Sequence, residues 1–221
     1  LALGRMGPDA EAAIPVLRDL MKEDGRDSDY QPEAVAALYH LAPEGKELAE
    51  EWLAKPMSGR SEPEIRYELE RRALVLGEMG DLEAAAACQR ACIEICERVE
   101  ERLLAAGARA ELGSLLLASG DHAAGREALL VARAAAETHG YQNTLVRATG
   151  ELAAAAAASP GPRSAGSRSA STQNAPAADA RAAFERHAAR LSQSQRRRAR
   201  LLLWRATGDR EHLLEARRLL D

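Results

Sequence analysis

The sequence predicts an all-α fold, and within that class an α-solenoid in which antiparallel helix pairs stack on one another. Three Gly-Asp dipeptides each follow one helix-forming run and precede another: Gly80-Asp81, Gly120-Asp121 and Gly208-Asp209. The first two lie 40 residues apart, and the last two lie 88 residues apart, close to twice that period. Glycine often ends a helix in the left-handed conformation, and aspartate accepts hydrogen bonds from the free N–H groups of the next helix. A period near 40 residues is typical of stacked helical repeats.

Composition favours helices along the whole chain. Only 3% of the 221 residues are aromatic, and the helix formers Ala, Leu, Arg and Glu dominate. No stretch alternates polar and apolar residues with the period of a strand. With 46% hydrophobic residues, the chain has enough apolar side chains for a continuous core.

The sequence also predicts where the protein resides. It contains no secretory leader and no apolar run long enough to span a bilayer, so we expect a cytoplasmic protein without membrane contact. Its three cysteines lie on one short segment, which does not suit a disulfide framework. The chain opens at Leu1 inside a helical pattern, and we therefore expect a fragment of a longer protein.

Residues 1–55 carry a repeat of a different length. Leu3 to Pro8 recurs 35 residues later as Leu38 to Pro43, and an amphipathic helix is expected behind each proline, over 9–21 and 44–53. Proline suits a first helical turn because its missing N–H would have no partner there. A third helix is expected over 32–41. The predicted inward-facing side chains are Ala13, Val16, Leu17, Leu20, Val35, Leu38, Leu41, Leu48, Trp52 and Leu53.

This region resembles a HEAT repeat of the short bacterial type. The matching positions are Ala2, Leu3, Gly4, Met6, Gly7, Pro8, Ala10, Ala13, Ile14, Pro15, Leu17 and Leu20. Tyr30-Gln31 stands where that family usually has Val-Arg. The resemblance implies stacked helix pairs over residues 1–55, with Gly7 and Pro8 at a repeat turn.

A linker is expected over 56–63, where two prolines and a glycine fall close together. The rest, 64–221, resembles the tetratricopeptide repeat in a 40-residue form, with helices expected over 64–79, 83–99, 103–119 and 123–138. The positions where that family requires small residues are Ala73, Ala85, Cys92, Gly113, Gly125 and Ala132. The consensus aromatic residues are replaced, so the likeness is one of spacing and small residues.

A segment rich in Ser, Gly, Pro and Ala, 159–176, interrupts the third repeat. Helices are expected before it, over 142–158, and after it, over 177–191, 194–207 and 211–220. The segment is nearly free of bulky apolar side chains, so we expect it to be disordered. It is either an insertion within one repeat or an interdomain linker, and the 88-residue spacing favours the insertion.

Catalysis, metal binding and cofactor binding are not expected. Cys88, Cys92 and Cys96 share a helix face, and soft-metal or redox chemistry was weighed against packing. Packing is favoured because Cys92 occupies a position that needs a small residue and no Cys-x-x-Cys pair is present. The five histidines are scattered, and no nucleophile motif or phosphate-binding loop occurs.

Charge is distributed unevenly along the chain. Residues 1–62 carry a net charge of −6 and residues 179–221 a net charge of +5. Arg196, Arg197, Arg198 and Arg200 form a basic run with Trp204 nearby, which makes a nucleic-acid-binding helical repeat the alternative function. An arginine-rich solvated helix face is favoured over it because acidic residues are interspersed.

The function expected from the repeats is a non-catalytic scaffold for protein–protein interaction. By repeat register, the residues facing a peptide groove are Arg66, Glu70, Arg109, Asn143 and Arg147. A small-molecule ligand is not expected. The resemblance further implies the regulatory region of a larger bacterial signalling protein of the Ser/Thr kinase, ATPase or cyclase type. A HEAT-type bilin lyase-like or other enzyme-associated module is a further alternative.

Overall fold

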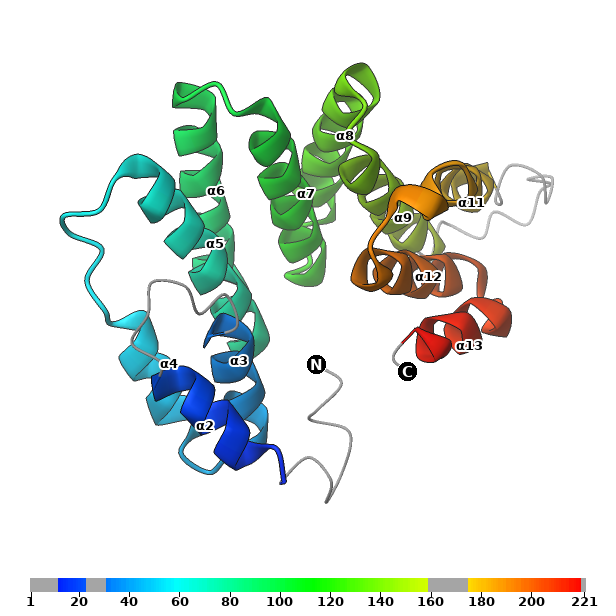
Figure 1. The fold of residues 1–221 in the computed structure, drawn as a ribbon. Coiled ribbons are helices and arrows are strands. Elements are labelled where there is room, and N and C mark those ends of the chain that lie inside the picture. Colours follow the sequence, from blue (N-terminus) through cyan, green and yellow to red (C-terminus); the bar gives the residue numbers. More distant parts are fainter. Residues whose placement is uncertain (1–11, 23–30, 159–174, 220–221) are drawn as a thin grey trace. The chain divides into compact units, whose positions relative to one another are not determined.

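The computed structural model describes residues 12–22, 31–158 and 175–219 (Figure 1). Within these ranges the chain forms eleven α-helices, one 3-10 helix and no strand, which confirms the predicted all-α class. The chain divides into two compact units, Leu1–Arg98 (unit 1) and Val99–Asp221 (unit 2). Gly7 and Pro8, and residues 159–174 of the predicted insertion, lie outside the described residues.

Unit 1 is built around α3 and α5. Its helices are α2 (Ile14–Lys22), α3 (Gln31–Leu41), α4 (Gly45–Leu53), α5 (Glu62–Met79) and α6 (Leu82–Arg98). The helix α3 packs against α2, α4 and α5, and α5 packs along α6. Val35, Trp52 and Val75 are buried together where α3, α4 and α5 meet. The predicted inward position of Val16 is wrong: 62% of this residue is exposed, whereas its neighbour Leu17 packs under α3.

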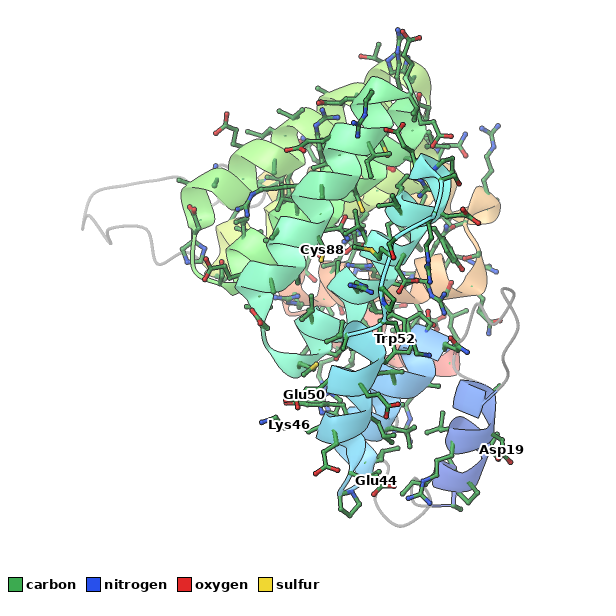
Figure 2. All side chains as sticks on the ribbon, turned by 90° about the vertical axis from the view of Figure 1, so that its left-hand side faces the viewer. Asp19, Glu44, Lys46, Glu50, Trp52 and Cys88 are labelled. Atoms are coloured by element: carbon green, nitrogen blue, oxygen red, sulfur yellow. The ribbon has the colours of Figure 1, made fainter. Side chains whose placement is uncertain are left out.

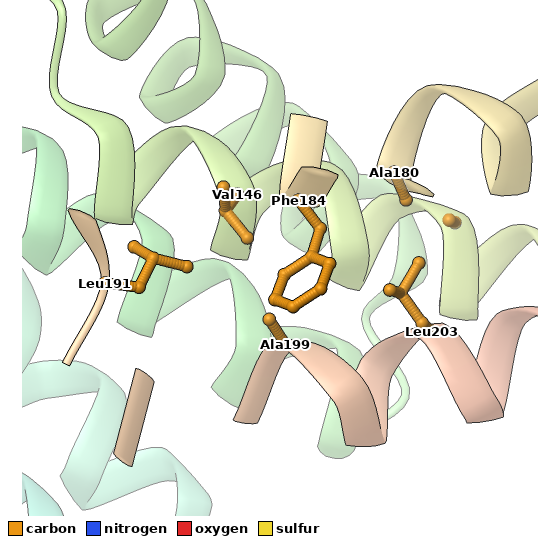
Figure 3. Packing of buried hydrophobic residues seen from close by; sticks show 7 residues of the cluster. Val146, Ala180, Phe184, Leu191, Ala199 and Leu203 are labelled. Atoms are coloured by element: carbon orange, nitrogen blue, oxygen red, sulfur yellow. The ribbon is translucent and has the colours of Figure 1, made fainter. Parts of the chain in front are cut away.

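Unit 2 is built around α9. Its helices are α7 (Arg102–Ala118), α8 (His122–His139), α9 (Gln142–Ala158), α11 (Ala175–His187), the 3-10 helix Ala188–Arg190, α12 (Gln193–Thr207) and α13 (Arg210–Arg218). The helix α9 packs against α7, α8, α11 and α12, while α13 packs against α12. Figure 3 shows the core between α9, α11 and α12, where the Phe184 ring lies among Val146, Ala199 and Leu203.

The Gly-Asp turns have the predicted geometry. Gly80, Gly120 and Gly208 have φ angles of +84°, +92° and +72°, in the region that favours glycine. The Asp81 and Asp121 carboxylates accept hydrogen bonds from the backbone N–H groups of Ala84 and Ala124, each over 3.1 Å. Asp209 accepts from the N–H of Glu211 over 3.0 Å. Each aspartate therefore satisfies one of the free donors at a helix start.

A fourth left-handed glycine lies between α8 and α9. Gly140 has a φ of +74°, and the N–H of the following Tyr141 donates to the carbonyl of Ala136. The sequence analysis did not assign a repeat turn here, because tyrosine replaces the aspartate that marks the other three turns. The glycine alone supplies the helix end.

The predicted small residues lie where helices pack most closely. Ala73, Ala85 and Cys92 are buried in unit 1. In unit 2, a Cβ atom added to Gly113 would lie 3.0 Å from the Gly125 carbonyl oxygen, and one added to Gly125 would lie 3.0 Å from the Gly113 oxygen. The backbones of α7 and α8 thus approach each other at a point that has no room for a side chain.

The predicted domain boundaries can be compared with the two units. The division between the units falls at Arg98 and Val99, inside the region predicted as 64–221, and the predicted linker 56–63 lies within unit 1. The assignment of HEAT-like and tetratricopeptide-like regions stays a prediction. Two boundaries shift: α5 begins at Glu62, and α11 begins at Ala175, so Ala175 and Pro176 belong to a helix instead of the insertion. Proline fits this first turn because no intrahelical N–H is lost.

Candidate functional site: charged side chains that connect the helices

Five side chains from three helices meet in unit 2. Glu111 and Ser114 come from α7, Arg147 and Glu151 from α9, and Arg198 from α12. Arg147 forms an ion pair with Glu111, and its Nη2 donates to the Ser114 hydroxyl over 3.3 Å. The Ser114 Oγ lies 3.1 Å from Glu151 Oε1. We call these five residues the inter-helix network.

Arg198 closes the network from the third helix. Its Nη1 lies 3.3 Å from Glu111 Oε1, and its Nη2 lies 3.9 Å from Glu151 Oε1. Two guanidinium groups therefore share two carboxylates, so the network carries no net charge. A guanidinium presents several donors in one plane, which suits it for bridging two acceptors.

The network is buried at one end and exposed at the other. The side chains of Arg147 and Glu151 are only 12% and 11% exposed, whereas those of Glu111 and Arg198 are 38% and 48% exposed. Burial lowers the pKa of Arg147, and the neighbouring positive charge of Arg198 lowers it further, while Glu151 raises it. Burial also lowers the pKa of Arg198, and Glu151 opposes that shift. The buried end joins the helices, and the side chains at the other end are partly exposed to solvent.

A second charged group lies in unit 1. The carboxylate of Glu68 on α5, whose side chain is 5% exposed, pairs with Arg60 at 3.1 Å, Arg71 at 3.7 Å and Arg72 at 3.4 Å. We call these four residues the Glu68 cluster. The guanidinium of Arg71 also lies 5.6 Å from the ring of Trp52 on α4 and 5.4 Å from the ring of Tyr67 on α5. Figure 2 shows Trp52 within this unit.

The five predicted groove residues divide between the units. Arg66 and Glu70 are one turn apart on α5 and form an ion pair at 2.8 Å. Arg109 is half-buried on α7, and Asn143 is exposed on α9, one turn from Arg147. The structure brings Arg147 into the inter-helix network, while Arg66 and Glu70 lie in unit 1 and the other three residues lie in unit 2.

Sequence reasoning did not find the partners of Arg147. Ser114 is 33 residues away from Arg147 along the chain, and Glu111 is 87 residues from Arg198. One local signal was present: Arg147 and Glu151 are the only charged residues in 142–158 and lie four apart. Two isolated opposite charges at that spacing share a helix face that is otherwise small and apolar.

The basic run on α12 is partly occupied by contacts inside the protein. Arg198 belongs to the inter-helix network, and Arg200 stacks 4.6 Å above the Phe184 ring centroid. Its Nη1 lies 2.9 Å from His212 Nδ1. Trp204, which follows the run on the same helix, is 36% exposed. These internal contacts leave the run fewer guanidinium groups for phosphate than its sequence suggests.

The cysteine stripe on α6 has the character of core packing. Cys92 and Cys96 are buried and Cys88 (Figure 2) is half-buried, and none of the three forms a disulfide. Burial, followed by the negative charge of Glu70, raises the pKa of Cys92 to about 12, which makes a thiolate unfavourable. Among the described residues, no three or more His, Cys, Asp or Glu side chains are grouped so that they could hold a metal ion.

An open hollow of about 350 Å³ lies at the ends of α9 and α12. Its lining consists of Ala154, Ala157, Ala158, Trp204, Arg205 and Gly208. Arg205 is its one ionisable residue, so this lining offers no acid–base pair for catalysis. In the described part of the chain, no helix has both the length and the apolar content needed to cross a membrane.

Comparison with protein-family models, curated proteins and solved structures finds no match to this chain.

Proposed function

We propose that this chain is a non-catalytic helical-repeat scaffold that binds a protein or a peptide segment. The repeats are HEAT-like over 1–55 and tetratricopeptide-like over 64–221, and they stack as an α-solenoid. Support comes from the helices of each unit, which pack mainly against their neighbours in sequence, and from the turns at Gly80, Gly120 and Gly208. In each turn a glycine with positive φ precedes an aspartate that accepts a hydrogen bond from the next helix.

The observation that carries the proposal is the inter-helix network. It connects α7, α9 and α12, which are the first helices of three successive proposed repeats. Such helices line one surface of a helical-repeat array, where an extended segment can lie across them. Glu111 and Arg198 keep their side chains partly exposed at this surface, and Asn143 is exposed on the same helix as Arg147. Both charges and an amide are thus available to orient a ligand.

The context we propose is the regulatory region of a larger bacterial signalling protein. This step rests on the resemblance to repeat regions that accompany kinase, ATPase and cyclase domains. A cytoplasmic location agrees with that context and forms part of the same proposal.

The test is a peptide-array screen with the purified chain, followed by affinity measurement on the peptides that bind. Arg198→Gln should weaken binding of those peptides at least tenfold, because it removes a half-exposed guanidinium from the proposed surface, and Asn143→Glu should do the same. The matched control is Arg133→Gln on α8, which also removes one guanidinium and one ion pair, that of Arg133 with Glu137 at 2.8 Å. Equal affinity of all three variants would remove the surface assignment.

Nucleic-acid binding is the second candidate, because of the basic run on α12. A titration of single- and double-stranded DNA at several salt concentrations tests it, since phosphate contacts make affinity fall steeply with salt. Absence of salt-dependent binding would exclude this function.

A further inference from the structure

A buried histidine connects the last described helix to the rest of unit 2. His212 lies on α13 and is only 6% exposed. Its Nδ1 is 2.9 Å from Nη1 of Arg200 on α12, the helix against which α13 packs. The Arg200 guanidinium is held in place because it lies 4.6 Å from the ring centroid of Phe184 on α11.

The contact determines which ring nitrogen carries the proton. A guanidinium has only donors, so Nδ1 of His212 must accept the hydrogen bond and the neutral ring carries its proton on Nε2. That Nε2 is buried and has no hydrogen-bond partner among the described residues. The site is therefore built for a neutral imidazole that accepts at one nitrogen.

Protonation would remove this arrangement. A proton on Nδ1 would turn the acceptor into a donor, and the new positive charge would face the charge of Arg200. The other charged groups near the ring are Arg181 on α11 and Asp209 and Glu211 at the start of α13. Burial and the two arginines lower the pKa of His212, and the two carboxylates oppose this shift without cancelling it.

We propose that His212 makes the docking of α13 on α12 depend on pH, so that α13 separates from α12 as the ring takes up a proton. The direction follows from proton linkage. Docked His212 binds a proton less readily than free histidine, whose pKa is about 6.5. The stabilisation is therefore complete above about pH 6.5 and is lost as the pH falls from there through the pKa of the docked residue.

Hydrogen exchange of the intact chain tests the proposal, with intrinsic exchange rates corrected for pH. Protection of the α13 amides should fall by up to about tenfold for each pH unit below pH 6.5, since one proton is taken up on opening. The amides of α7 and α8 serve as an internal reference and should keep their protection. Protection of α13 that does not change between pH 7.5 and pH 5.5 would overturn the proposal.

Two variants and one direct titration make the test specific. His212→Gln keeps an acceptor for Arg200 but cannot titrate, so protection of α13 should become independent of pH. His187→Gln, at the end of α11, should retain the dependence. An NMR titration of the His212 ring in the unaltered chain should give a pKa below 6.5. A value above 6.5, or an unchanged pH dependence in His212→Gln, would contradict the proposal. These outcomes do not depend on peptide binding.

Discussion

Units 1 and 2 place charge among their helices in opposite ways. In unit 1, one buried carboxylate, Glu68, is met by Arg71 and Arg72 from its own helix and by Arg60 from the segment just before it. In unit 2, Glu111 and Glu151 are met by Arg147 and Arg198, and the four come from three helices. The Glu68 cluster is thus local in sequence, and the inter-helix network is not. The ion pairs of the first join residues of one helix and the segment before it, whereas those of the second join helices that are distant in sequence.

The two units also differ where their long helices pack. Ala73 and Ala85 are buried in the α5–α6 pair, while Gly113 and Gly125 occupy the corresponding positions of the α7–α8 pair, 40 residues later. Alanine keeps a methyl group between two backbones, and glycine removes it. The α7–α8 pair thus has no room for the methyl group that the α5–α6 pair carries at these two positions.

The largest effect is expected for Glu68→Gln. This change leaves three guanidinium groups around a neutral amide, and loss of one partner from a buried ion pair costs about 3 kcal/mol or more. Urea unfolding of the full chain measures it. The matched change in unit 2, Glu111→Gln, removes a half-exposed carboxylate and should cost under about 1 kcal/mol. Similar losses of unfolding free energy in the two variants would contradict this distinction between the Glu68 cluster and the inter-helix network.

Gly125→Ala should come next, with a loss of about 1–2 kcal/mol. The new methyl group would lie 2.9 Å from the backbone nitrogen of Leu117, and overpacking of this kind outweighs the better helix propensity of alanine. Gly107→Ala on α7 is the control, because no atom lies within 4 Å of its added Cβ. It should stabilise the chain by about 0.5–1 kcal/mol. Thermal unfolding of both variants measures whether each substitution lowers or raises the stability of the chain. A higher stability in both variants would mean that α7 and α8 can move apart.

A smaller loss than that of Gly125→Ala is expected at the turns, and it should be equal in the two units. Gly80→Ala and Gly120→Ala each place a Cβ on a backbone with positive φ, at a cost of about 1 kcal/mol, and neither methyl group meets another atom. Urea midpoints of the two variants measure this cost. A marked difference between the two losses would show that the two turns are not equivalent, and would weaken the repeat assignment.

Much of the fold could be predicted because the turns contain residues with a specific conformational role. Gly80, Gly120 and Gly208 marked helix ends to within two residues, since few other residues adopt the left-handed conformation at low cost. The end of α8 at Gly140 was not assigned to a repeat turn, because no aspartate follows the glycine. Val16 lies at the edge of the single apolar side of α2, so helical periodicity alone did not show that it is exposed.

The candidate site could be predicted only in part. Register placed Arg147 on the first helix of a repeat, but it could not show that Glu111 and Arg198 would reach it from other helices. Helical periodicity describes one helix at a time, and contacts between residues so far apart depend on how the helices pack. The pairing of Arg200 with His212 escaped prediction for the same reason.

The helix α9 has four neighbouring helices but mainly small side chains, and the second half of its sequence is almost entirely alanine. Alanine loses no rotamer freedom when it is enclosed, so this helix can be surrounded without the entropic cost that leucine or methionine would bring. It also contributes little apolar area at each contact. The stability of unit 2 is therefore expected to come from many contacts around α9, each of which contributes little. Enlargement of a buried alanine of this helix, such as Ala153, should consequently disturb several helix pairs together.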